Sequence, residues 1–317
     1  MNRELPVLAI VIPCYNEEEA LPITTARLLE LIDKMITSSL ISRDSYILCS
    51  NDGSRDNTWN VINHLHKKDS RIKGISLAHN RGHQYALLAG LMAVKDRCDV
   101  SVSIDADLQD DPDAIIQMVK DYRSGMDIVY GVRSSRTTDT WFKRTSAHAF
   151  YSFQRKMGLD TIYDHADYRL MDNNALRLLS EYGESNLFLR GIVPSIGLKS
   201  SVVKYARSER VAGESKYPLG KMISLSIDGI TSFSAKPMRL IFVTGLILLL
   251  LDLLVALYVL ISYFNHATIS GWSSLMLSVW FLGSLILMGL GIVGEYIGKI
   301  FIEVKHRPRY AVAEELF

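Results

Sequence analysis

Cysteine is scarce in this 317-residue sequence, which contains three cysteines and no Cys-x-x-Cys pair. So few cysteines, in an odd number, support neither a disulfide framework nor a zinc knuckle. Glycine (20) and proline (8) are too rare for a collagen-like or disordered chain. The 35 basic and 34 acidic residues nearly cancel, and no basic block occurs. Nucleic-acid binding is therefore not expected, because phosphate contacts require clustered lysine and arginine.

Two phosphate-binding signatures are missing as well. No Gly-x-Gly-x-x-Gly follows the first apolar run, and no Gly-x4-Gly-Lys-Ser/Thr occurs. A dinucleotide-binding Rossmann domain and a P-loop enzyme are therefore unsupported. The first apolar run is short and lacks a small-residue cleavage site, so the sequence predicts no signal peptide.

Charge is unevenly spread along the chain. Residues 1–239 contain 31 basic and 29 acidic residues, whereas residues 240–317 contain 4 and 5. Two apolar runs, 240–264 with the single charge of Asp252 and 272–294 with none, are each long enough to cross a hydrocarbon core of about 30 Å. The short connection 265–271 predicts that they form a transmembrane two-helix hairpin.

Basic residues flank this hairpin on both sides, and its connecting loop has none. The positive-inside rule therefore predicts that both termini and the first domain are cytoplasmic. Asp252 would face a helix neighbour or be protonated. Glycines in the second run allow close helix packing, which is compatible with a homo-oligomer such as a tetramer. The predicted division is a first domain over 1–216, a juxtamembrane amphipathic region over 217–238, two spans within 239–298, and a cytoplasmic tail over 299–317.

The juxtamembrane region leaves two interpretations open. Its apolar face could lie in the membrane interface, or it could pack on the first domain.

The first domain alternates between short apolar runs and amphipathic stretches. This pattern predicts an α/β fold with a mostly parallel sheet covered on both faces. Polar clusters follow each apolar run, at the carboxyl ends where such sheets bind ligands. The expected strands are 8–13, 45–52, 71–78 and 99–107, and the expected helices are 17–36, 58–68 and 83–96.

Asp105 and Asp107 end the fourth apolar run. Residues i and i+2 of an extended segment share a face, so both carboxylates can point at one site. Such hard oxygen ligands suit Mg²⁺ or Mn²⁺ bridged to substrate phosphates. Asp52 and Glu17 stand at neighbouring strand ends, which strengthens this interpretation.

Five motifs in order resemble those of family 2 inverting glycosyltransferases. They are Pro13-Cys14-Tyr15-Asn16-Glu17, Asn51-Asp52-Gly53-Ser54-Arg55-Asp56, Asn80-Arg81-Gly82, Asp105-Ala106-Asp107-Leu108-Gln109-Asp110 and Gly131-Val132-Arg133. The segment from His165 to Met171, the pattern Arg210-x4-Ser215-Lys216-Tyr217 and the two apolar runs resemble the polyprenyl-phosphate branch, above all bactoprenol (undecaprenyl-phosphate) glucosyltransferases. Dolichol-phosphate mannose synthases share the catalytic domain.

This resemblance implies a GT-A-type, Rossmann-like catalytic domain and a role for each motif. Asp105 and Asp107 would hold Mg²⁺ or Mn²⁺ beside the donor diphosphate, with Gln109 close by. Asp105 would also contact the nucleotide. The expected nucleotide-binding residues are Pro13, Tyr15, Glu17 and Asp52, and the expected acceptor-phosphate ligands are Arg133, Arg210 and Lys216.

The implied reaction transfers a sugar from a nucleotide-sugar to a membrane polyprenyl phosphate with inversion. UDP-glucose is the first choice of donor, and N-acetylglucosamine, mannose, galactose and aminoarabinose donors remain open. The product would be a lipid-linked sugar at the inner (plasma) membrane for O-antigen, lipopolysaccharide or wall-polymer modification. A flippase and a second glycosyltransferase would act downstream.

Asp167 is the residue that the resemblance nominates as catalytic base. A phosphate monoester has its second pKa near ~6 and is already largely deprotonated at neutral pH. We therefore expect Asp167 mainly to orient a substrate, and Arg169 to pair with a nearby carboxylate. Two other functions remain open, a processive polysaccharide synthase and a membrane-tethered scaffold without catalysis. The first is disfavoured because the sequence has no Arg-Trp pair and only two spans.

Overall fold

A computed structural model describes residues 4–134, 165–185, 187–206 and 271–317, together with scattered positions between 238 and 257. The described residues fall into two compact units. The first unit contains the residues up to 134, those from 165 to 206, and 307–317. The second contains the described residues between 238 and 306. The C-terminal residues thus return to the unit in which the chain begins.

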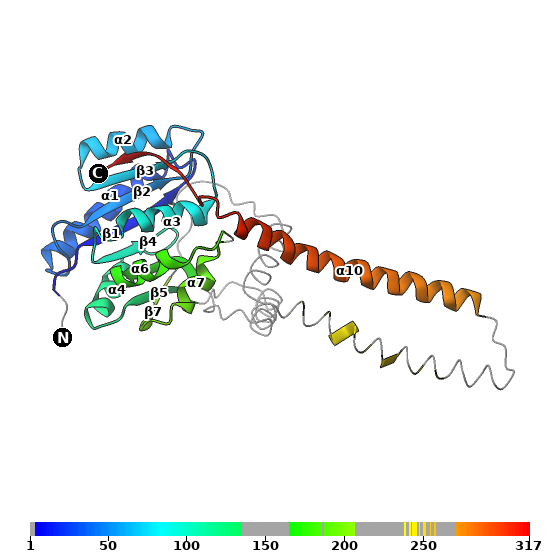
Figure 1. Cartoon of the computed structure of the whole chain (residues 1–317). Helices are drawn as coiled ribbons and strands as arrows, with labels where there is room; N and C mark the ends of the chain where they lie inside the picture. The colour runs from blue at the N-terminus through cyan, green and yellow to red at the C-terminus, as the bar shows by residue number, and fades with distance from the viewer. Residues whose placement is uncertain are drawn as a thin grey trace. The chain divides into compact units, whose positions relative to one another are not determined.

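A single eight-stranded sheet organises the first unit (Figure 1). Strand β1 pairs in parallel with β2 and β4, β2 with β3, and β5 with β7, whereas β6 and β8 run antiparallel to their neighbours. The expected α/β fold with a mostly parallel sheet is confirmed. The sheet order is β7 (Ser200–Tyr205), β5 (Ile128–Arg133), β6 (His165–Asp172), β4 (Val100–Ser103), β1 (Leu8–Cys14), β2 (Tyr46–Asn51), β3 (Ile72–Leu77) and β8 (Val312–Leu316).

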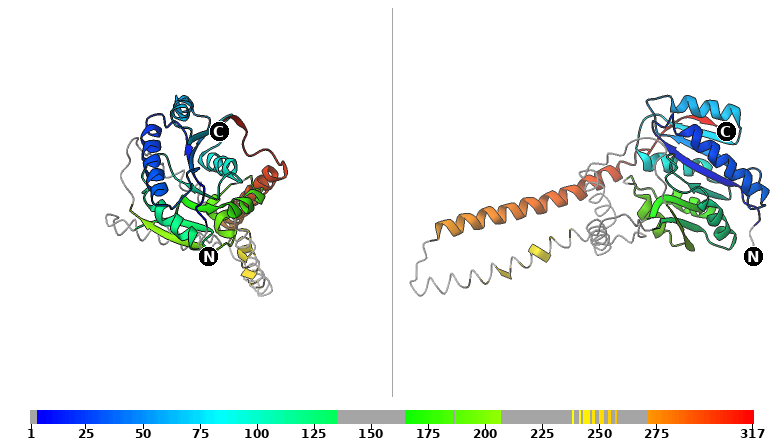
Figure 2. Two further views of the ribbon diagram at one scale, coloured as in Figure 1. Left: turned by 90° about the vertical axis from the view of Figure 1, so that its left-hand side faces the viewer. Right: turned by 180° about the vertical axis from the view of Figure 1, so that it is seen from behind.

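Helices cover both faces of this sheet (Figure 2). Alternate residues of β1, such as Leu8 and Ile10, point into a buried cluster shared with α1 (Leu21–Thr37), α2 (Thr58–Lys68) and α4 (Ala114–Arg123). The alternation of side chains along a strand sends Val11 to the opposite face, where α3 (His83–Val94) packs. Helix α6 (Asn173–Glu181) contacts α3, and the short α7 (Leu189–Ser195) contacts β6.

The element boundaries follow local chemistry. The strands expected over 8–13, 45–52 and 71–78 are present to within one or two residues, and α2 spans the predicted 58–68. Helix α1 begins at Leu21, four residues later than expected. Pro22 lies in its first turn, where the missing N–H of proline costs no hydrogen bond, and the three glutamates before it remain in a turn.

The strand β8 lies at the C-terminal end of the chain and was not expected from the sequence. It pairs antiparallel with β3, from Gly74 opposite Leu316 to Leu77 opposite Val312. Trp59 of α2 donates from its indole nitrogen to Glu314 at 3.0 Å, and the Arg97 guanidinium lies 4.0 Å from the centre of the Phe317 ring. Residues 299–317 were predicted as a tail, and the last eleven of them belong to the same compact unit as the first domain.

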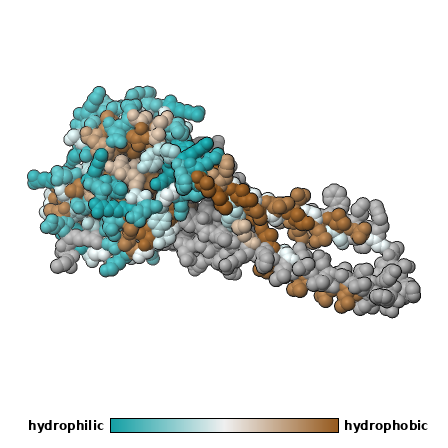
Figure 3. All heavy atoms as spheres, viewed as in Figure 1, coloured by the Kyte–Doolittle hydropathy of each residue, from teal (hydrophilic) through white to brown (hydrophobic). Residues whose placement is uncertain are grey.

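The second unit contains the 33-residue helix α10 (Trp272–Val304). Within it, Phe281–Val304 is long and apolar enough to cross a membrane, and none of its apolar window is buried. Large apolar side chains line its surface (Figure 3). The helix begins where the second run was expected and continues ten residues beyond Gly294, with Lys299 and Glu295 3.9 Å apart at i,i+4 spacing.

Only part of the first predicted span lies among the described residues. Described positions between 238 and 257 are helical, with exposed apolar side chains such as Val243 and Leu254. Asp252, most of the first run and the loop up to 270 lie outside the described residues, as does the region 217–237.

Candidate active site

The register of the sheet brings the predicted site residues to one edge. Strands β1, β2, β3 and β4 are parallel, so their carboxyl ends meet there. The antiparallel β6 arrives at this edge with its first residues. Ser103 pairs with Arg169, and continuing that register by two residues places Asp105 opposite Asp167. The motif that contains Asp105 and the segment that contains Asp167 thus converge although more than sixty residues separate them.

Asp52 is buried and holds a loop in place. Its two carboxylate oxygens accept hydrogen bonds from the backbone nitrogens of Arg81 and Gly82, each at 2.8 Å. Burial raises the pKa of Asp52, and the two amides oppose that rise. The neighbouring Asn51 stabilises the turn that follows β2, because its side-chain oxygen accepts a hydrogen bond from the hydroxyl of Ser54 at 2.6 Å. Asp52 therefore shapes the 79–82 loop of the site.

The other expected nucleotide-binding residues lie at the carboxyl end of β1. Pro13 is buried in β1, in register with Ser50. Tyr15 is 39% exposed just beyond the strand. The backbone nitrogen of Glu17 donates to the Thr58 hydroxyl at 2.9 Å, which ties this turn to the start of α2. These positions leave the Tyr15 ring open to a ligand at the sheet edge.

Asp105 lies among like charges. Partial burial raises the pKa of its carboxyl to about 6, His83 opposes the rise, and Asp110, Asp167 and Asp107 add to it. His83, the first residue of α3, places its Nε2 3.7 Å from an oxygen of Asp105 and 3.7 Å from an oxygen of Asp167. The side chains of His83 and Asp105 are 45% and 41% exposed, so both can reach a ligand.

The loop that carries Asp107 has an unusual backbone. Leu108 adopts a φ of 50°, a left-handed conformation that non-glycine residues rarely take. This turn lets the Gln109 backbone nitrogen donate to a carboxylate oxygen of Asp107 at 3.2 Å. Strain of this kind occurs at functional sites, where the surrounding structure holds the chain in place. The loop thus holds Asp107 and Gln109 next to Asp105.

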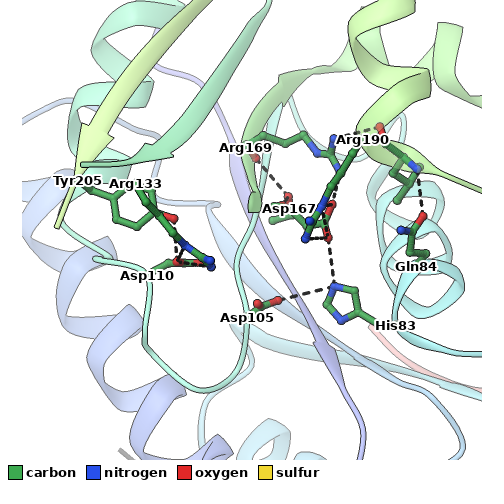
Figure 4. Close-up of polar contacts among 11 residues, drawn as sticks. His83, Gln84, Asp105, Asp110, Arg133, Asp167, Arg169, Arg190 and Tyr205 are labelled. Atoms are coloured by element: carbon green, nitrogen blue, oxygen red, sulfur yellow. Dashed lines mark hydrogen bonds and ion pairs between the residues drawn. The ribbon is translucent and has the colours of Figure 1, made fainter. Parts of the chain in front are cut away.

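Arg133 belongs to a cluster on one side of this loop (Figure 4). Its guanidinium donates to Asp110 at 3.2 Å, and the Tyr205 hydroxyl donates to the same oxygen at 2.7 Å. Asp110 is buried, so Arg133 and Tyr205 compensate its charge. Helix α4 begins at Ala114 with Asp113 at its N-cap, so Asp110 lies in the loop before the helix.

Asp167 lies on the other side of the loop, between two arginines (Figure 4). Arg169 donates to one carboxylate oxygen at 3.0 Å, as expected, and Arg190 of α7 donates to the other at 3.0 Å. The hydroxyl of Ser103 donates to the backbone oxygen of Asp167. Asp167 is 7% exposed and Arg169 is wholly buried, whereas the Arg190 side chain is 44% exposed.

The structure brings most predicted site residues together and adds two. Asp52, Asp105, Asp107, Gln109, Arg133 and Asp167 all lie at the same sheet edge. Arg210 and Lys216 lie outside the described residues. Neither Arg190 nor the contact of His83 with Asp105 and Asp167 was predicted from the sequence. The signal for Arg190 was one arginine inside the apolar stretch LFLRGIV.

The fold and the acidic edge define an α/β enzyme that binds its ligand beyond the carboxyl ends of the strands. The chain belongs to glycosyl transferase family 2, whose model matches residues 9–180. It is a glycosyltransferase. It is 50% identical over 317 residues to the uncharacterized glycosyltransferase YkoT of Bacillus subtilis (strain 168), covering 100% of this chain and 94% of that protein.

A second relative has a more specific name. The bactoprenol glucosyl transferase of Shigella phage SfV is 36% identical over 310 residues, covering 97% of this chain and 98% of that protein. Among solved structures, mannosyl-3-phosphoglycerate synthase from Rubrobacter xylanophilus matches with a TM-score of 0.47 and 15% identity, covering 74% of each chain. Membership of the family rests on the sequence relatives.

Proposed function

We propose that this enzyme transfers a hexose from a nucleotide-sugar, most simply glucose from UDP-glucose, to the phosphate of a membrane polyprenyl (undecaprenyl) phosphate. The observation that carries the proposal is the meeting of Asp105, His83, Asp167 and Arg190 at one sheet edge. This acidic and basic cluster lies in a chain that aligns along nearly its full length with a bactoprenol glucosyl transferase.

The chemistry of the donor set fits a divalent cation. No group of three or more metal-ligating side chains occurs within the described ranges. Mg²⁺ and Mn²⁺ need fewer, because they bind through one or two carboxylates together with substrate phosphates and water. Like charges crowd Asp105, and a cation there would relieve that repulsion. Asp105 and Asp107 would hold the ion, which would neutralise charge developing on the leaving diphosphate.

In the proposed reaction an oxygen of the acceptor phosphate attacks the anomeric carbon. The bond from that carbon to the nucleoside diphosphate breaks, and its electron pair leaves with the diphosphate. One displacement inverts the anomeric centre. Asp52 keeps the 79–82 loop in shape for the nucleotide, and Tyr15 offers its exposed ring to the base.

Basic residues would receive the acceptor phosphate. Arg133 is 28% exposed and shares its charge with Asp110, so it can offer remaining N–H groups to an anion. Arg210 and Lys216 are proposed for the same phosphate on the strength of the sequence motif.

The path of the chain supports a membrane anchor with an even number of crossings. The described residues before 207 and after 306 belong to one compact unit, and α10 between them is a candidate span. A chain that leaves this unit, crosses a membrane and returns must cross an even number of times. We therefore propose the predicted two-span hairpin at the plasma membrane, with the catalytic unit in the cytoplasm. A homo-oligomer and the downstream flippase and transferase remain predictions.

The decisive experiment incubates purified enzyme with undecaprenyl phosphate and a panel of labelled nucleotide-sugars. Mg²⁺, Mn²⁺ or a chelator is added in parallel. We expect label to appear in the lipid fraction with one donor, and the chelator to abolish it. Incorporation from none of the donors would refute the proposal, whereas polymer formed without lipid phosphate would identify a processive synthase instead.

A further inference from the structure

The ion pair around Asp167 is asymmetric. Its inner partner, Arg169, is wholly buried, and its outer partner, Arg190, exposes 44% of its side chain at the edge where ligands bind. The Asp167 carboxylate itself is 7% exposed. Of these three charged groups, the one best placed to touch a substrate is therefore the Arg190 guanidinium.

Arg190 is held in a defined position from two directions. Its Nε and Nη2 both donate to Asp167, at 3.3 and 3.0 Å to the same carboxylate oxygen. The start of α7 is fixed as well, because the Leu189 backbone oxygen accepts from Arg169 at 3.2 Å and its nitrogen donates to Gln84 at 3.0 Å (Figure 4). A guanidinium anchored through one edge presents its opposite edge to a ligand.

The charge and the donors of this cluster favour the binding of an anion. Two guanidinium groups and one carboxylate give Asp167, Arg169 and Arg190 a net charge of +1. Asp105 also attracts Arg190, and its charge is the one that the proposed cation would balance. Within the described part of the chain, Nη1 of Arg190 has no acceptor. Arginine presents five donors in a planar fork, which matches the oxygens of a phosphate.

The same contacts make Asp167 a weak base. Burial acts to raise the pKa of this carboxyl, but the charges of Arg190 and Arg169 hold it well below its usual range. A general base works best when its pKa lies near the working pH. A carboxylate bound by two arginines is far from that condition, whereas it is well suited to hold a guanidinium in place.

We propose that Arg190 is a phosphate ligand of the active site, and that Asp167 acts as the positioning residue that holds it there. The phosphate belongs either to the diphosphate of the nucleotide-sugar or to the polyprenyl phosphate. This inference rests on the proposed function, because it deepens the account of the same site. It assigns to Arg190 a role that neither the motifs nor the resemblance gives it.

The test compares Arg190→Gln and Arg190→Lys with the unchanged enzyme. The matched control is Arg177→Gln, which removes a 63% exposed arginine paired with Asp96 away from the site. Steady-state kinetics are measured with each substrate varied in turn. Losing a charge-assisted hydrogen bond predicts a rise of about 10- to 100-fold in the KM of the substrate whose phosphate Arg190 binds. Arg190→Lys should recover part of the loss, since it keeps the charge without the fork.

The two phosphate sources are separated by binding measurements that need no turnover. Calorimetric titration with UDP reports on the donor, and the thermal shift produced by undecaprenyl phosphate in detergent reports on the acceptor. Weaker binding of either one in Arg190→Gln supports the proposal and names the source. Unchanged KM values and unchanged binding of both ligands would overturn it. This holds also if Arg190→Gln lowers the melting temperature, because Arg190 would then only stabilise the fold. These titrations remain informative if no sugar donor is ever found, which separates failure of this inference from failure of the proposed function.

Asp167→Asn distinguishes positioning from proton transfer. If Asp167 positions Arg190, the loss should be similar at pH 6 and pH 8.5, and adding Arg190→Gln should cost little more, because the two residues act as one unit. Recovery of Asp167→Asn activity at pH 8.5 together with additive losses in the double variant would show a base and overturn the positioning role.

Discussion

The ionised Asp105 carboxylate lowers the folding stability of the metal-free protein, and this effect can be measured. Its pKa rises to about 6 through burial and the neighbouring carboxylates. A carboxyl whose pKa is raised on folding favours the folded state below its unfolded pKa of about 3.9, and this advantage is lost as the pH rises through the folded value. Above pH 6 the ionised Asp105 therefore destabilises the fold unless a cation balances it.

Replacing Asp105 with asparagine should remove this destabilisation of the folded state. The pKa rise corresponds to about 3 kcal/mol at most, and because the side chain is 41% exposed, solvent screening reduces the expected gain to about 1 kcal/mol. Thermal unfolding in EDTA should show Asp105→Asn more stable than the unchanged protein at pH 7.5 and equal to it near pH 4. Added Mn²⁺ should stabilise only the unchanged protein. A gain that persists at pH 4 would contradict the electrostatic explanation.

Some site residues could be predicted from the sequence, but the partners of Asp167 could not all be found in this way. Asp52, Asp105 and Asp107 were identifiable because each follows an apolar strand, and parallel strands bring such ends together. The partners of Asp167 were harder to find, since Arg190 lies 23 positions along the chain on another element. Only the docking of α7 on β6 places that guanidinium, and a linear motif does not encode such a contact.

Among the elements, β8 is linked to the 79–82 loop of the candidate site through the segment that precedes it. Arg81 donates from its Nε to the Arg309 backbone oxygen at 2.9 Å, and its own backbone nitrogen donates to Asp52. The segment leading into β8 and the buried Asp52 therefore hold the same loop from opposite sides. The sequence did not predict this strand, because AVAEELF lacks both an apolar alternation and a turn signal.

Deleting residues 312–317 should weaken both the sheet edge and the donor loop. The deletion removes the ladder to β3 and releases Arg309 and Pro308, which accept hydrogen bonds from Arg81. We expect a lower thermal midpoint and several-fold weaker UDP binding by calorimetry. Phe317→Ala is the control, since it removes a ring contact with Arg97 and keeps the ladder. Unchanged UDP affinity in the deletion would show that Asp52 alone maintains the loop.

The packing of α3 on the sheet depends on a glycine. A Cβ at Gly90 would lie 2.5 Å from Cγ1 of Val11 and 3.2 Å from Cβ of Ser50. Gly90→Ala should therefore push α3 away from β1 and β2 and cost about 2 kcal/mol of unfolding free energy, as overpacking of a core does. Gly183→Ala meets nothing within 4 Å and is the control for chemical denaturation. Equal midpoints for the two variants would mean that α3 adjusts without strain.

At the scale of the whole molecule, the two units predict a membrane topology. One unit contains the described residues both before 207 and after 306, so the proposed hairpin would begin and end on the same side of the membrane. The three native cysteines are buried, so an introduced cysteine can be labelled selectively. In intact cells, a membrane-impermeant maleimide should label Thr268→Cys, and it should label Glu315→Cys only after lysis. Labelling of both positions only after lysis would contradict the hairpin.

The parts of the fold that follow a simple periodic sequence pattern could be predicted. The strand–helix alternation gave the parallel half of the sheet, and charge-free length indicated α10. The antiparallel strands β6 and β8 were not predictable in this way, because each is placed by pairing with a strand distant in sequence. The continuation of α10 to Val304 was missed because Glu295, Lys299 and Glu303 end the apolar run without ending the helix.

The return of the chain to β3 also has a consequence for the order of biosynthesis. Strand β8 is synthesised about 100 residues after β7, with the second unit in between. About 235 residues separate the end of β3 from the start of β8, so at roughly 5–20 residues per second the edge of β3 stays unpaired for on the order of 10–50 s. The sheet is thus completed only after the second unit, which contains the proposed membrane span, has been synthesised, and the contact of Arg81 with Arg309 also forms only then.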